Sequence, residues 1–258
     1  MRSIIFSSFV VSAFFGCRTS PLTETPSEIK GDRLKEWAAY KANPDGFFAM
    51  IGSTNPIPAN GSREEEYNLQ QLKALNDLPF TPPSPGRKDS LTRFEAQILF
   101  DAVTNHPVAK LSNYQKYDPK NQGIGYCFGR AMTAHLEAIW NPELKLQNNR
   151  VRKLFAIGNL VTGPNNWRYH VTAIVKSSEG GWWAVDPYVG SLMTAKEWYL
   201  RMQSYNTYSK DMLLFHDEGM QFGPEGDKHY RLPDLEDAYY SGYFKDLLNS
   251  YRRTFRQR

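Results

Sequence analysis

The amino-acid sequence predicts an α+β fold, and three observations support that prediction. Helical periodicity dominates the first half of the chain, and short β-branched or aromatic runs follow only after residue 150. Hydrophobic residues make up 41% and aromatic residues 14% of the 258 residues, which is enough for one large packed domain. No internal repeat or low-complexity tract interrupts this order.

The first residues have the form of an export signal. Arg2 supplies a positive charge, residues 4–15 are almost wholly apolar, and the small residue Gly16 follows. The apolar run is shorter than the ~20 residues that a membrane-spanning helix needs. Cys17 comes next and precedes a polar segment, an order that resembles a bacterial lipoprotein signal. We therefore expect a signal peptide over 1–16, a tether over 17–30 and a lipid anchor on Cys17 in the cell envelope, with plain secretion as the alternative.

Two helices are expected after the tether. The first covers residues 33–42 and ends at the turn residues 43–46, Asn-Pro-Asp-Gly. The second covers residues 63–78, and the run 79–86 then contains four prolines and a glycine, which no regular element accommodates. We expect residues 31–88 to be a helical N-terminal extension or a pro-region, and residues 89–258 to be the catalytic domain.

The expected catalytic domain contains helices with one apolar face and a run of strands. Ser90 is expected to cap a helix whose apolar stripe is Leu91, Phe94, Ile98, Leu99 and Ala102. A loop is expected over 113–125, and a capping box, Thr194 with Glu197, opens a later helix. The other expected elements are helices over 127–140 and 235–251 and strands over 154–161, 170–175 and 182–185.

Cys127 is the first candidate for chemistry. It is expected to be the first residue of a helix and follows a glycine-rich loop that includes Gly123 and Gly125. At a helix N-terminus the backbone dipoles favour the thiolate, and free N–H groups face a developing oxyanion. The chain has two cysteines, so acylation of Cys17 would leave Cys127 as a lone thiol in an exported protein. A buried, inert cysteine is the alternative interpretation.

His170 and Asp186 are the second and third candidates. His170 opens one predicted strand, Asp186 closes the next, and residues 176–180 between them are turn-forming. A three- or five-residue loop centred on Ser178 would place His170 and Asp186 directly opposite each other, whereas a four-residue loop would break this pairing. In such a group the imidazole handles the proton, the carboxylate orients the imidazole, and the thiolate forms an acyl-enzyme.

The motifs around these residues resemble the protein-glutaminase family. The resemblance rests on Gly125 to Ala131, on Tyr169-His170-Val171 and on Val185-Asp186-Pro187 followed by residues 194–198, and it covers roughly residues 110–215. It implies a papain-like or transglutaminase-like core in which a helix carries the cysteine and an antiparallel sheet carries the histidine and aspartate. It further implies deamidation of glutamine side chains in proteins, so we expect protein substrates with exposed glutamine.

Secondary candidates surround these three residues. Gln122 lies five residues before Cys127 and is a candidate oxyanion donor, while His135, further along the same predicted helix, is expected to be an interior residue. The aromatic candidates for a substrate pocket are Tyr126, Trp167, Trp182 and Trp183.

The composition and motifs exclude several classes of protein. The net charge of +4 comes from 31 basic and 27 acidic residues, and no basic block with interleaved aromatics predicts nucleic-acid binding. No zinc-binding spacing occurs around His216 and His229, so neither a metal nor another cofactor is expected. A cysteine peptidase or a transglutaminase would use the same three residues. An inactive membrane-anchored binding module is the alternative from a different class.

Overall fold

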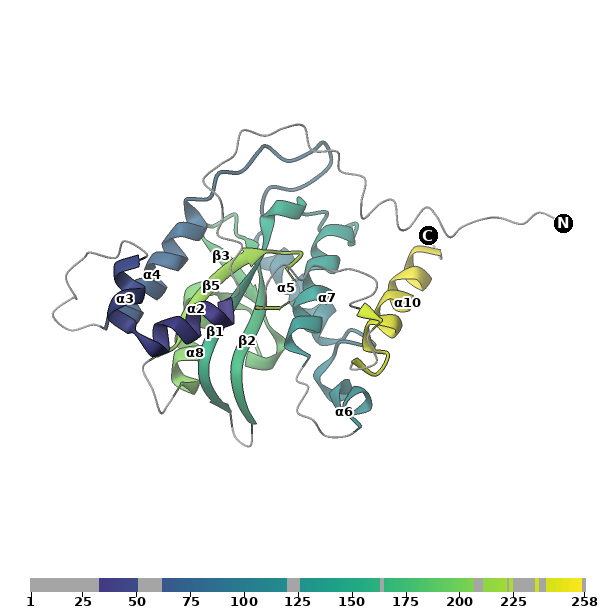
Figure 1. Ribbon diagram of the computed structural model, residues 1–258. Coiled ribbons are helices and arrows are strands. Elements are labelled where there is room, and N and C mark those ends of the chain that lie inside the picture. The colour runs from purple at the N-terminus through teal and green to yellow at the C-terminus, as the bar shows by residue number, and fades with distance from the viewer. Residues whose placement is uncertain are drawn as a thin grey trace. The chain divides into compact units, whose positions relative to one another are not determined.

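The computed structural model describes residues 33–50, 62–119, 126–162, 165–206, 211–221, 223–224, 235–236 and 240–256. Residues 31–258 form one compact unit, and the expected signal peptide, tether and Cys17 lie outside the described residues. Helices and a mixed-length antiparallel sheet build this unit, so the predicted α+β fold class is confirmed (Figure 1). Among the described residues, no helix is both long and apolar enough to cross a bilayer.

The sheet has five strands in the order β4-β3-β2-β1-β5, and every paired neighbour runs antiparallel. β1 and β2 are long and form a hairpin at the centre of the sheet, and a register irregularity between Ile157 and Leu160 interrupts their pairing. β5 was not predicted from the sequence, because its two leading leucines and Phe215 are followed by polar residues without alternation. The strands are β1 Val151–Thr162, β2 Asn165–Lys176, β3 Trp182–Val185, β4 Met193–Thr194 and β5 Leu213–Glu218.

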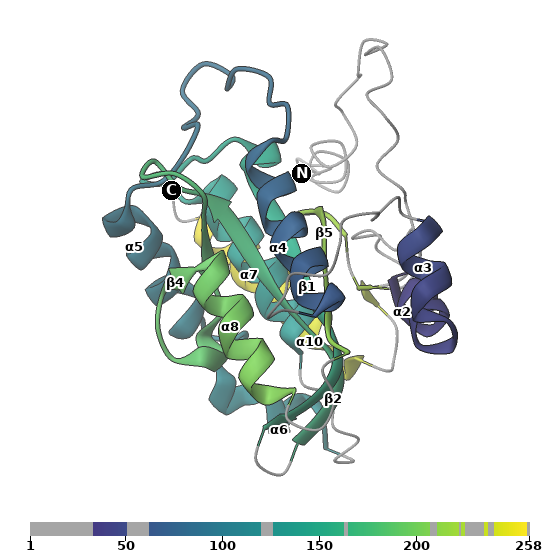
Figure 2. The ribbon, with the colours of Figure 1, turned by 90° about the vertical axis from the view of Figure 1, so that its left-hand side faces the viewer.

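Helices cover both faces of the sheet. α5 (Arg93–Thr104) and α7 (Cys127–Trp140) pack on the face that carries Phe155, Val171 and Ala173. α8 (Ala195–Tyr205) packs on the opposite face, where Leu154 and Ile174 lie (Figure 2). α10 (Tyr243–Arg256) adds a third apolar cluster against α7. The short elements in this part of the chain are α6 Tyr114–Tyr117 and the 3-10 turns Leu111–Asn113, Asn148–Arg150 and Pro187–Val189.

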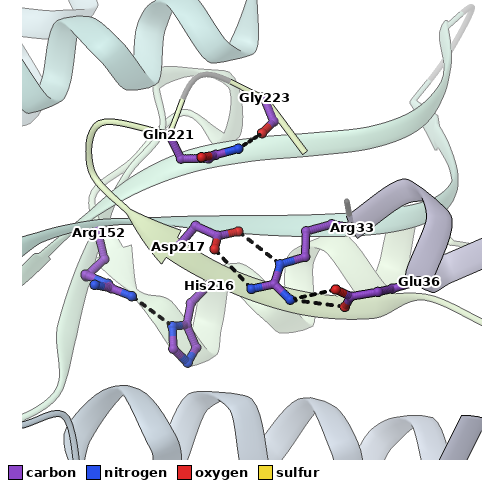
Figure 3. Close-up of polar contacts among 7 residues, drawn as sticks. All are labelled: Arg33, Glu36, Arg152, His216, Asp217, Gln221 and Gly223. Atoms are coloured by element: carbon purple, nitrogen blue, oxygen red, sulfur yellow. Dashed lines mark hydrogen bonds and ion pairs between the residues drawn. The ribbon is translucent and has the colours of Figure 1, made fainter. Parts of the chain in front are cut away.

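The N-terminal helices pack against the sheet edge formed by β5. They are α2 Arg33–Ala42, α3 Pro44–Met50 and α4 Arg63–Asn76. The Asn68 side chain of α4 accepts a hydrogen bond from Leu214 N (2.7 Å) and donates one to Met212 O (2.9 Å), so it occupies backbone groups that a further strand would otherwise pair. Arg33 binds both carboxylate oxygens of Asp217 at 3.0 and 3.1 Å (Figure 3). These contacts make α2 and α4 part of the same packed unit as the sheet.

Several predicted boundaries are wrong by a few residues, each for an identifiable reason. The helix expected after Ser90 begins at Arg93 and is capped by Thr92 with Glu95, because the backbone of Leu91 bonds to Lys176 and Ser178 instead. Phe94 is consequently 75% exposed and not part of the buried stripe. Pro44 does not end the helical region but occupies the first position of α3, where its missing N–H is not needed.

Other elements match the prediction more closely. The helices over 33–42 and 127–140 have the predicted bounds, and the Thr194–Glu197 capping box is present with its helix extending to Tyr205. The loop predicted over 113–125 contains the short helix α6. The C-terminal helix starts at Tyr243 rather than residue 235 and continues to Arg256.

Candidate functional site

Cys127 is the first residue of α7, and the residue before it has an unusual backbone. Tyr126 adopts the left-handed conformation (φ 50°, ψ 25°), which non-glycine residues rarely occupy. Its buried ring fixes this conformation, because the hydroxyl donates to Tyr117 O at 2.6 Å and the ring stacks on Tyr243 at 4.4 Å. Strained backbone of this kind is concentrated at functional sites. Here it directs the chain abruptly into the helix at Cys127.

Gly129 allows α10 to pack closely against the start of α7. A Cβ atom added to Gly129 would lie 2.4 Å from the Tyr243 ring, so no larger residue fits without moving one helix. The Cys-Phe-Gly-Arg segment is therefore positioned by Tyr243 as well as by its own helix. Cys127 as a whole residue has intermediate exposure, in contrast with the buried His170 and Asp186.

Asp186 directly follows the short strand β3, and His170 lies on the neighbouring strand β2. β3 pairs with β2 only from Ala173 to Lys176, so His170 is beyond the last pair. The His170 Nε2 and Asp186 Oδ2 atoms are 2.7 Å apart, and the two side chains are 1% and 3% exposed. Asp186 Oδ1 accepts from the Tyr188 backbone at 3.1 Å, and Oδ2 accepts from Trp198 Nε1 at 2.8 Å. The carboxylate is thus held by three donors in a dry environment.

The register that joins these strands differs from the predicted one. The loop has five residues, as one alternative required, but it is centred on Glu179, since Lys176 pairs with Trp182. Asp186 is therefore two residues out of line with His170, and the direct pairing predicted for them is wrong. A two-residue shift preserves the face of the sheet, so the long imidazole still reaches the carboxylate diagonally.

Cys127 lies close enough to His170 for each side chain to shift the pKa of the other. Since Nε2 of His170 is engaged by Asp186, Nδ1 is the nitrogen that remains for proton exchange with a thiol. α7 packs mainly on one face of the sheet, whereas Trp198, beside His170, belongs to the cluster on the other. Cys127 of α7 and Trp198 both lie close to His170, in the part of β2 that has no β3 partner. His170 and Asp186 thus form a hydrogen-bonded pair, and Cys127 lies within electrostatic reach of it; a shared catalytic role for the three stays a prediction.

The charges of this group reinforce one another. Burial raises the pKa of the Cys127 thiol, but the hydrogen bond and charge of His170, with a smaller contribution from Arg130, lower it overall. Burial would lower the pKa of His170, yet Asp186 and Cys127 outweigh it and raise that pKa to about 9. Burial also opposes ionisation of Asp186, but His170 and Trp198 hold the pKa of the carboxyl below its usual range. All three directions favour the thiolate–imidazolium form of the pair over the neutral form.

Aromatic rings enclose the imidazole. Trp167 lies nearly parallel to it, with centroids 4.9 Å apart and planes at 17°, and Trp198 lies at 6.0 Å and 23°. Tyr188 packs edge-on against Trp167 at 4.7 Å and donates a hydrogen bond to Thr162 Oγ1 at 2.7 Å. Trp167 is partly exposed and lies beside the imidazole, and its role as a pocket wall stays a prediction. Sequence reasoning missed Trp198, although its position in the motif after Asp186 was part of the family resemblance.

The other pocket candidates have different surroundings. Tyr126 is 1% exposed and packs inside the α7–α10 cluster, and Trp182 is 4% exposed with its Nε1 donating to Leu75 O. Trp183 is 5% exposed and borders a cavity of about 350 Å³ formed with residues of α5, β4 and α8, to which Cys127, His170 and Asp186 do not contribute. These three aromatics are core residues, and the structure gives them no place beside the thiol.

The remaining candidates are Gln122, His135 and His216. Gln122 lies outside the described residues, so its role as an oxyanion donor stays a prediction. His135 is fully buried in α7 and its pKa is lowered to about 4 by burial, in keeping with an interior residue. His216 faces Arg152 at 3.4 Å (Figure 3), and no group of three or more His, Cys, Asp or Glu side chains suited to a metal occurs among the described residues.

Comparisons with known proteins give only distant similarity. No family model matches the chain, and no curated protein sequence matches it significantly. Two solved structures are similar: pro-protein-glutaminase at 14% identity and an A47Q2 mutant of pro-protein-glutaminase at 15%. Each comparison has a TM-score of 0.43 and covers 71% of this chain and 68% of the other. Similarity at this level does not assign the chain to that family, so its function must be inferred from the site itself.

Proposed function

We propose that this protein is a cysteine-dependent amidohydrolase that deamidates glutamine side chains in proteins. One observation carries the proposal: Cys127, at the start of α7, lies within electrostatic reach of a buried imidazole whose Nε2 is 2.7 Å from Asp186 Oδ2. The sequence motifs around these residues, which resemble the protein-glutaminase family, supply the substrate class. The natural substrates follow as proteins with accessible glutamine.

The proposed reaction has two halves. The Cys127 thiolate attacks the carboxamide carbon, and the oxygen becomes negative near the free N–H groups of the first turn of α7. His170 gives its Nδ1 proton to the departing nitrogen, ammonia leaves, and a thioester remains on Cys127. A water molecule then gives a proton to His170 and attacks the thioester, which releases glutamate and the thiolate. Asp186 keeps the imidazole in the required tautomer throughout.

A side-chain amide suits this site better than a main-chain amide. The spacing between Cys127, His170 and Asp186, 43 and then 16 residues, leaves little chain for insertions that would grip an extended peptide on both sides. A primary carboxamide needs only a narrow slot, and the partly exposed ring of Trp167 supplies one apolar wall beside the imidazole. Free glutamine is expected to be a poorer substrate, because its charged backbone groups would lose hydration in such a slot.

Casein incubated with the enzyme tests this proposal when ammonia, new amino termini and incorporation of a primary amine are recorded together. We expect ammonia without new termini and with little amine incorporation in water, and none of the three with Cys127→Ala. Casein fragments that appear before ammonia would identify a peptidase instead. Amine incorporation that accounts for most of the ammonia released would identify a transglutaminase, and inactivity on all three readouts would favour a binding module.

A further inference from the structure

Arg130 is a buried cation beside the proposed nucleophile. It lies on α7, three residues after Cys127, so the two side chains are neighbours on one face of the helix. Side chains of a helix lean toward its N-terminus, which directs the long Arg130 side chain toward Cys127. The residue is 4% exposed, and its Nε is buried without a hydrogen-bond partner.

A guanidinium in this position requires compensation. Arginine stays protonated in proteins, so it cannot escape the cost of burial by losing its charge. Burying an ion costs several kcal/mol unless an opposite charge lies nearby. Two anionic groups are within electrostatic reach of Arg130, the Cys127 thiolate and the Asp186 carboxylate, since its charge contributes to lowering the pKa of both.

Other charged groups also face the thiol. His170 approaches from β2, and Lys153, fully buried on β1, is close enough that a thiolate on Cys127 acts on its charge. Burial lowers the pKa of Lys153 to about 7, so this amine is only partly charged at neutral pH. Arg130 is therefore the permanent positive charge among the described groups that act on Cys127.

We propose that Arg130 is a positioning residue that stabilises the Cys127 thiolate directly and supports Asp186 in orienting His170. The inference deepens the proposed function, since it assigns an electrostatic role within the same site. A purely structural alternative is that Arg130 only balances the charge of Asp186. The two interpretations differ in one observable, the pH at which Cys127 becomes a thiolate.

The test is the pH dependence of iodoacetamide alkylation, followed by mass spectrometry on the peptide that contains Cys127 in the full-length protein. We expect Arg130→Met to raise the pH of half-maximal reactivity by about one unit or more, a tenfold change in the thiol–thiolate equilibrium. Arg130→Lys should stay within a few tenths of a unit of wild type. Lys153→Met, which removes the other buried cation, should give a smaller shift. Arg252→Met on the exposed face of α10 should give none.

A combined variant separates the direct effect from the one through Asp186. Arg130→Met is added to Asp186→Asn, so that both charges are removed together. We expect this double variant to keep a folded core even where Arg130→Met alone does not fold. We expect a further upward shift relative to Asp186→Asn alone. An unchanged midpoint in this pair, or a shift in Lys153→Met as large as that in Arg130→Met, would overturn the proposal. Alkylation needs no substrate, so a failure to release ammonia from casein would not be mistaken for this result.

Discussion

At the scale of single residues, the charges of the candidate site depend on interactions that offset the cost of burying them. His170 and Asp186 are almost inaccessible to solvent, so burial acts against the charge of each. Their mutual hydrogen bond, the indole of Trp198 and the neighbouring thiol reverse that effect. Cys127, taken as a whole residue, is less buried than either of them.

Asp186→Asn tests whether the carboxylate takes part in turnover. The amide keeps a hydrogen-bonding partner for His170 but favours the other imidazole tautomer. We expect the rate of ammonia release to fall at least ~10²-fold, by analogy with the serine triad. Far-ultraviolet circular dichroism should remain that of the wild type. Wild-type turnover in this variant would remove Asp186 from the mechanism.

The pH dependence should differ between alkylation and deamidation. Both require the thiolate, so both should rise as the pH passes the lowered pKa of Cys127. Deamidation also requires protonated His170, and the raised pKa means that this proton is lost as the pH climbs through about 9. We expect ammonia release to decline above that pH while alkylation stays fast. A parallel decline of both rates would contradict the assigned role of His170.

At the scale of elements, the helices and strands that could be predicted are those whose sequence signals lie close together in the chain. α7 and the Thr194 capping box were predictable because periodicity and capping residues lie within one or two turns. The hairpin register was missed by two residues because turn composition does not fix the centre of a five-residue loop. His170 and Asp186 still share a face of the sheet despite that error, because side-chain direction alternates with a period of two.

The same limits apply to the parts of the site that were missed. Arg130 and Trp198 lie near predicted site residues in the sequence. Their burial, however, depends on which helices pack on each face of the sheet. Trp182 and Trp183 were candidates for the substrate pocket because they are aromatic and lie near Asp186 in the sequence. Their rings instead fill the two cores on either side of β3. Tertiary packing decides such cases, and no local pattern reports it.

Asn68 tests whether α4 is an integral part of the sheet edge. Asn68→Ala would leave Leu214 N and Met212 O without their buried partners, at a cost of roughly 1–3 kcal/mol for each group. We expect the free energy of unfolding in urea to fall by about 2–4 kcal/mol. Asn76→Ala, at an exposed position of the same helix, is the matched control and should change it by less than about 0.5 kcal/mol. Equal effects would show that α4 is a dispensable attachment.

At the scale of the whole molecule, the N-terminal helices bear on whether the protein is processed after synthesis. Residues 31–88 were expected to be an extension or a removable pro-region. Arg33, Asn68 and Leu75 contribute an ion pair, edge hydrogen bonds and core packing to the same unit as the sheet. Removing this segment would expose the β5 edge, and the choice between an extension and a removable pro-region stays a prediction.

Cellular location is a separate prediction that rests on Gly16 and Cys17. Cys17→Ala should move the protein from the membrane fraction to the soluble fraction, or leave it unprocessed, because the acceptor for lipid is lost. Cys127→Ala should stay with membranes and serves as the control. Wild-type protein recovered wholly in the soluble fraction, without an acyl mass on its N-terminal peptide, would establish plain secretion.

The central claim is that His170 activates the Cys127 thiol, and the alkylation rate at Cys127 tests it most directly. Wild-type protein and His170→Ala are treated with iodoacetamide near neutral pH, and the Cys127 peptide is quantified over time. We expect fast labelling in the wild type and a loss of that advantage in the variant, because the imidazolium that stabilises the thiolate is gone. Equal, slow labelling in both proteins would contradict an activated thiolate and, with it, the proposed function.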